Sequence, residues 1–117
     1  MKTHMDLDVW KLSMDLVENI YNMSSCFPKE EIYGLTSQIR RAAISIPSNI
    51  AEGASRNGSK EFVQFLYISL GSISEVETQI MLAKRLGFVD KADSILKDIT
   101  TIKKMLNGLI GHLKGKI

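Results

Sequence analysis

Apolar residues recur along the chain at alternating spacings of three and four, the period of an α-helix with one buried face. The clearest stripe lies near the C-terminus and consists of Ile95, Ile99, Ile102, Leu106, Leu109 and Leu113. The pattern predicts four helices, at residues 8–24, 31–54, 60–86 and 91–114. No segment alternates apolar and polar residues as a half-buried strand does. The sequence therefore predicts an all-α fold.

The segments between these helices are short. Connections of a few residues make sequential helices antiparallel neighbours, so we expect an antiparallel up-down-up-down four-helix bundle. The expected bundle is a single domain over residues 1–117. Pro47 lies inside the second helix, where proline removes one backbone hydrogen bond and crowds the carbonyl four residues earlier. We therefore expect the second helix to be kinked near Pro47.

Polar residues form a stripe along the second helix, and a similar stripe follows on the third. The members are Gln38, Arg41, Ser45, Asn49, Glu52, Ser72, Glu75 and Gln79. A buried polar group destabilises a fold unless it is paired, so the favoured interpretation is an interhelical or intersubunit polar network. A ligand or nucleic-acid site is the alternative. A catalytic site is disfavoured, because the sequence pairs neither Glu52 nor Glu75 with an identifiable nucleophile or metal ligand.

Composition changes this picture little. The 117 residues are 44% hydrophobic and 24% charged, as in an ordinary globular domain, and the formal net charge is +2. That balance excludes a strongly cationic protein and leaves room for a local basic patch. Cys26 is the single cysteine, so no intramolecular disulfide can form.

Motifs for metal, cofactor or membrane binding are missing from the sequence. His4 and His112 lie near opposite ends, and no Glu-x-x-His pair of the di-iron bundle type occurs. No phosphate-binding glycine loop of a nucleotide-binding protein is present. We therefore expect neither a metal nor a cofactor. No apolar stretch approaches the about 18 residues of a membrane span, and the N-terminus does not resemble a signal peptide, so we expect a cytoplasmic protein.

Basic residues cluster modestly in the second and third helices. The candidates for phosphate contacts are Arg40, Arg41, Arg56, Lys60, Lys84 and Arg85. Repetition of such a surface around an oligomer would strengthen its field. The alternative is an ordinary solvated face in which acids are interspersed. Tyr33 and Tyr67 are the candidates for stacking on single-stranded bases.

Three stretches of sequence resemble the 23S ribosomal RNA intervening-sequence protein family. They are DLDVW at residues 6–10, Phe27-Pro28, and the run YGLTSQIRRAAISIPSNIAEG from Tyr33 to Gly53. Shorter matches extend the resemblance over nearly the whole chain: Phe65-Leu66, Gly71-Ser72 followed by Glu75, and Arg85-Leu86-Gly87. The family consists of four-helix-bundle proteins encoded within intervening sequences of bacterial 23S ribosomal RNA genes and elsewhere in bacterial genomes.

The resemblance carries expectations about assembly. The family is similar in fold to the accessory variability proteins of diversity-generating retroelements, which form ring-shaped homopentamers and bind nucleic acid and a reverse transcriptase. The resemblance thus implies a homopentamer that binds RNA or acts as a scaffold, and it does not imply an enzyme.

Three hypotheses about function follow. The first is a non-enzymatic, oligomeric bundle that binds RNA or a nucleic-acid-processing protein through basic surface patches, without a small-molecule substrate. The second is a protein-interaction scaffold without nucleic-acid affinity. The third is a hydrolase or ligand-binding bundle, which would need a concave pocket holding Glu52 or Glu75.

Overall fold

Four α-helices carry the apolar stripes in the computed structural model, which describes residues 2–117. They are α1 (Asp8–Ser24), α2 (Leu35–Ala54), α3 (Ser59–Arg85) and α4 (Asp93–Lys114). Two short 3-10 helices, η1 (His4–Asp6) and η2 (Lys29–Glu31), precede α1 and α2. No strand occurs among the described residues. The prediction of an all-α fold with four helices is confirmed.

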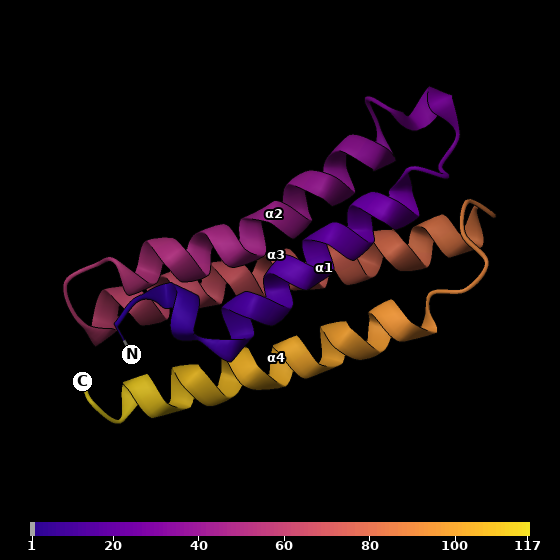
Figure 1. Ribbon diagram of the computed structural model, residues 1–117. Helices are drawn as coiled ribbons and strands as arrows, with labels where there is room; N and C mark the ends of the chain where they lie inside the picture. The colour runs from indigo at the N-terminus through magenta and orange to yellow at the C-terminus, as the bar shows by residue number, and fades with distance from the viewer. Residues whose placement is uncertain (1) are drawn as a thin grey trace.

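Each helix packs against the next one in the chain, and α4 also contacts α1. Consecutive helices run in opposite directions along a body of 46 × 24 × 20 Å, so the α1–α2 and α3–α4 loops lie at the same end (Figure 1). The centre consists of fully buried aliphatic side chains, among them Leu16, Ile20, Ile39, Ile46, Leu66, Ile73, Ile80, Ile99, Ile102 and Leu106. Residues 2–117 contain no helix with the length and apolar character needed to cross a lipid bilayer.

The start of α2 differs from the sequence prediction. The helix begins at Leu35 and not at residue 31, because residues 29–31 form η2. The carboxylate of Glu31 accepts a hydrogen bond from the Leu35 amide at 3.1 Å and thereby satisfies one free N–H of the first turn. Gly34 separates the two elements with a non-helical backbone (φ −114°, ψ −116°). Apolar periodicity does not register this side-chain contact, so the predicted start is four residues early.

The most extensive helix contact is that between α2 and α3. A Cβ atom at Gly53 would lie 2.7 Å from Phe65 Cβ and 3.2 Å from the Phe62 carbonyl oxygen, which leaves no space for a side chain. Ser69 Oγ donates to the carbonyl oxygen of Ile46 at 2.9 Å, directly before Pro47. α2 is continuous through Pro47, and the kink expected there stays a prediction.

Gly53→Ala should therefore lower the free energy of unfolding by about 1–3 kcal/mol, the usual effect of overpacking. Gly108 is the matched control, since it lies within α4 and has open space where a Cβ would be. Gly108→Ala should raise stability by about 0.5–1 kcal/mol, because alanine loses less backbone entropy than glycine. Urea denaturation measures both values. Equal stabilisation by the two substitutions would contradict the close approach of α2 and α3.

Candidate nucleic-acid interface

Three members of the predicted polar set form a hydrogen-bonded cluster, and one bond of this cluster joins α2 to α3. Ser45 Oγ and Ser72 Oγ share a hydrogen bond of 2.8 Å. Asn49 Nδ2 donates to the Ser45 carbonyl at 2.8 Å and to Ser45 Oγ at 2.9 Å. Asn49 and Ser45 are half-buried and Ser72 is buried, so these groups are paired within the bundle. Ser45 and Ser72 form the interhelical contact, and Asn49 donates to Ser45 from within α2.

Three other members lie at the surface beside this network. Gln38, Arg41 and Glu75 are exposed. Together with Ala42, Ser45 and Ser72 they line an open groove of about 280 Å³ between α2 and α3. Among the ion pairs within residues 2–117, none joins Arg41 to Glu75. The groove is shallow and polar. A hydrolase or ligand-binding bundle that uses Glu75, the third hypothesis, would have to bind its substrate here.

The remaining two members lie apart from the groove. Glu52 Oε1 accepts a hydrogen bond of 2.6 Å from Arg56, one turn later in the chain. Gln79 is buried, and its Oε1 atom has no hydrogen-bond partner in the described part of the chain. Hydrogen bonds thus connect only Ser45, Asn49 and Ser72 of the eight predicted members among the described residues.

The six predicted phosphate-contact residues fall into two groups. Arg56 and Lys60 flank the α2–α3 turn, whereas Lys84 and Arg85 end α3 at the opposite end of the bundle (Figure 1). Arg40 and Arg41 lie in the first two turns of α2, nearer to Lys84 and Arg85. A single contiguous basic surface is thus not formed within one subunit.

Arg40 also has a structural role that its sequence position does not reveal. Its Nε donates to Ser24 Oγ at 2.8 Å, and its Nη2 donates to the Tyr21 carbonyl at 3.3 Å. The guanidinium carbon lies 4.5 Å from the centre of the Tyr21 ring. Arg40 therefore ties the last turn of α1 to α2. By contrast Lys84 and Arg85 are exposed and belong to no ion pair among residues 2–117.

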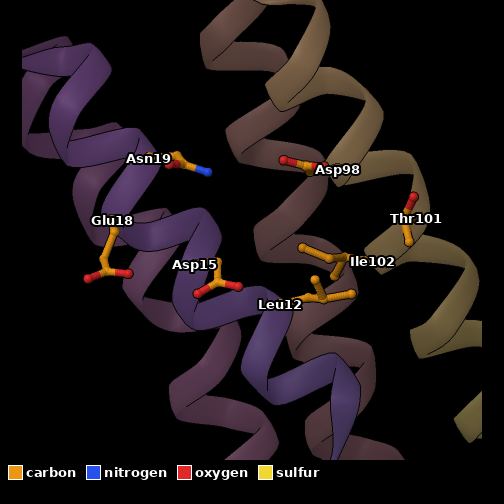
Figure 2. A pocket seen from close by; sticks show the side chains of 7 residues that line it. All are labelled: Leu12, Asp15, Glu18, Asn19, Asp98, Thr101 and Ile102. Atoms are coloured by element: carbon orange, nitrogen blue, oxygen red, sulfur yellow. The ribbon is translucent and has the colours of Figure 1, made fainter.

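An acidic groove opens on another face, between α1 and α4. Its volume is about 350 Å³, and it is lined by Leu12, Asp15, Glu18, Asn19, Asp98, Thr101 and Ile102. Asp15 and Asp98 point toward the space between the two helices, and Leu12 and Ile102 meet at one end of it (Figure 2). Carboxylates on both walls repel phosphate, so this face is unsuited to nucleic acid.

Sequence reasoning missed the acidic groove. Its carboxylates lie on two helices that are far apart in the chain, with Asp15 and Glu18 exposed and Asp98 half-buried. In the sequence each one alone looks like part of a solvated face. The pair Asp15 and Asn19, spaced by four, was the available signal. Within residues 2–117 no group of three or more His, Cys, Asp or Glu side chains is placed to hold a metal ion.

Comparison with known proteins identifies one family. The model of the 23S rRNA-intervening sequence protein family matches residues 5–108, nearly the whole chain. A search of curated proteins finds no significant match.

Arg40→Ala should lower the free energy of unfolding by about 1–2 kcal/mol, because it removes two hydrogen bonds from a charged donor and a cation–π contact. Arg41→Ala is the control. Arg41 is exposed and makes none of the side-chain hydrogen bonds or ion pairs found among the described residues, so its substitution should change stability by less than about 0.5 kcal/mol. Thermal or urea denaturation distinguishes them, and equal effects would refute the structural role of Arg40.

Proposed function

The chain belongs to the 23S rRNA-intervening sequence protein family, and we propose that it is a non-enzymatic, oligomeric four-helix bundle that binds RNA through basic surface patches. The observation that supports this most is the pair Lys84 and Arg85, which are exposed and have no ion-pair partner among residues 2–117. Unpaired cations of this kind bind phosphate without first breaking an internal contact. The family name and the bundle are consistent with a cytoplasmic protein of a bacterial host.

Electrostatics favours the ends of the bundle over its sides. The net charge is only +2, so long-range attraction is weak and binding depends on local groups of cations. Phosphate contacts made by Lys and Arg release counterions, which makes affinity fall as salt rises. They also carry no sequence information. The proposed activity is therefore salt-dependent RNA binding, with the acidic α1–α4 groove turned away from the RNA.

Two exposed apolar regions support assembly into an oligomer. Met14, Tyr21 and Ile44 lie on the α1–α2 side, and Met14 and Ile44 line a shallow apolar groove there. Met81 and Leu82 lie near the end of α3 and Leu86 directly follows it, and these three side chains are 45–55% exposed. Because different surfaces of one subunit would meet, the contact is heterologous and generates a closed ring or an open filament. We propose the ring, with the homopentamer that the family resemblance implies.

The second candidate is a scaffold that binds proteins and has no affinity for nucleic acid. The same exposed apolar regions favour it, since patches of this kind often mark protein-binding surfaces. In that case the cationic ends are ordinary solvated surface. The two candidates differ in one respect that can be measured directly, namely the effect of charge reversal on RNA affinity.

Arg85→Glu should weaken binding to a fluorescently labelled RNA hairpin about fivefold or more at low salt, and it should reduce the slope of log affinity against log salt by about 1. Lys104→Glu makes the same charge change at an exposed lysine in the middle of α4 and should leave both values near those of the wild type. Polarisation titrations over a series of salt concentrations measure the RNA affinity and the slope. Absence of RNA affinity at low salt would favour the scaffold, and RNA affinity that does not depend on salt would contradict binding through phosphate contacts.

Leu82→Asp should shift the mass measured by light scattering from a pentamer toward a monomer at micromolar concentration. A carboxylate placed in an apolar contact is unpaired and desolvated, which disfavours association. Thr100 is exposed on α4, outside both apolar regions, so Thr100→Asp should leave the mass unchanged. A monomeric wild-type protein would contradict the proposed ring whatever its RNA affinity.

A further inference from the structure

Tyr33 is the most exposed large apolar side chain of the described residues, with 95% of its surface accessible. It lies in the loop between α1 and α2, and its neighbour Ile32 is 51% exposed. An aromatic ring that contacts almost nothing contributes little to the bundle's stability. The ring of Tyr33 is therefore available to contact a ligand.

The loop that carries Tyr33 is tightly held. Backbone hydrogen bonds run from the Ile32 amide to the Lys29 carbonyl at 3.2 Å and from the Gly34 amide to the Glu31 carbonyl at 2.9 Å. The Glu31 carboxylate also accepts from Leu35 and occupies the space beside Gly34. The backbone on both sides of Tyr33 is fixed. Binding of a ligand to the ring would therefore cost the loop little conformational entropy.

Lys84 and Arg85 lie at the same end of the bundle as Tyr33. Ser45 faces Ser72, and Gly53 faces Phe62 and Phe65. This antiparallel register brings the end of α3, with Lys84 and Arg85, level with the loop that carries Tyr33 (Figure 1).

The two loops at this end also meet. Phe27 packs on Phe88 at 5.8 Å between ring centres, which joins the α1–α2 loop to the α3–α4 loop. The exposed cations here are Lys29, Lys84, Arg85 and Lys91, the exposed acids are Glu30, Asp90 and Asp93, and Glu31 is half-buried. Lys84 and Arg85 are the two cations of this set that are adjacent in the chain, so positive charge is concentrated at the end of α3.

We propose that Tyr33 is a stacking platform for an unpaired base of single-stranded RNA, with Lys84 and Arg85 contacting the flanking phosphates. The inference rests on the proposed RNA binding and names the form of RNA that this end selects. Base–aromatic stacking tolerates any sequence, because every base has a π-face. Bases inside a duplex are already stacked on each other, so unpaired segments supply this contact.

Tyr67 is the other tyrosine that the sequence offers for stacking. It is 44% exposed on α3, and Lys114 Nζ lies 5.2 Å from the centre of its ring. One face of this ring is thus already covered by a cation of the same chain. Tyr67 therefore serves as a matched control for removal of an exposed aromatic ring.

The test compares Tyr33→Ala, Tyr33→Phe and Tyr67→Ala by fluorescence polarisation with a labelled oligouridine of about 12 nucleotides. Tyr33→Ala should weaken oligouridine binding about fivefold or more, whereas Tyr33→Phe keeps the ring and should bind like the wild type. Tyr67→Ala should also bind like the wild type. Affinity for a blunt RNA duplex of the same length should be unchanged in all three variants.

Each contrary result has a defined meaning. Wild-type oligouridine affinity in Tyr33→Ala, with salt-dependent RNA binding retained, overturns the stacking role and leaves the proposed function intact. An equal loss of oligouridine affinity in Tyr33→Phe assigns the effect to the hydroxyl group and also overturns the stacking role. A change in the oligomer mass of Tyr33→Ala by light scattering identifies Tyr33 as a subunit contact instead. If the wild type binds neither RNA at low salt, the proposed function itself fails.

Discussion

The close approach of α2 and α3 is the constraint on which the rest of the bundle depends. Gly53 has no space for a Cβ atom against Phe62 and Phe65, and Ser45 and Ser72 are near enough to share a hydrogen bond. Small side chains at these positions let the two helices approach closely. The contacts at Gly53 and between Ser45 and Ser72 fix the register of α2 against α3.

This constraint explains much of the sequence run that resembles the family. Ser45 and Gly53 contact α3, and Asn49 donates to Ser45 within α2. Arg40 contacts α1 and holds its last turn. Several residues of this run therefore build the bundle. Function is proposed instead for the outward surface, at the end where two loops meet and where Lys84 and Arg85 form no ion pair with any other residue of 2–117.

Much of the fold followed from apolar periodicity, because the spacing of buried aliphatic residues is a local property of each helix. The same stripe that predicted the fourth helix contains Ile99, Ile102 and Leu106, all fully buried. The start of α2 did not follow, since it depends on the Glu31 side chain reaching the Leu35 amide. The candidate site was the feature that could be predicted least well from the sequence. The cations are separated into two ends, and Asp15 and Asp98 line one groove from two helices. Both features depend on which helices lie side by side in space, which spacing along one helix does not encode.

Hydrogen–deuterium exchange with and without saturating oligouridine tests the central claim most directly, namely that RNA is held at the end of the bundle that carries Tyr33, Lys84 and Arg85. Bound RNA should slow amide exchange in residues 29–34 and 85–92, because it covers both loops at this end. Peptides of the acidic α1–α4 groove, residues 12–19 and 98–102, should exchange at unchanged rates. Protection of that groove with no change in the two loops would contradict the account.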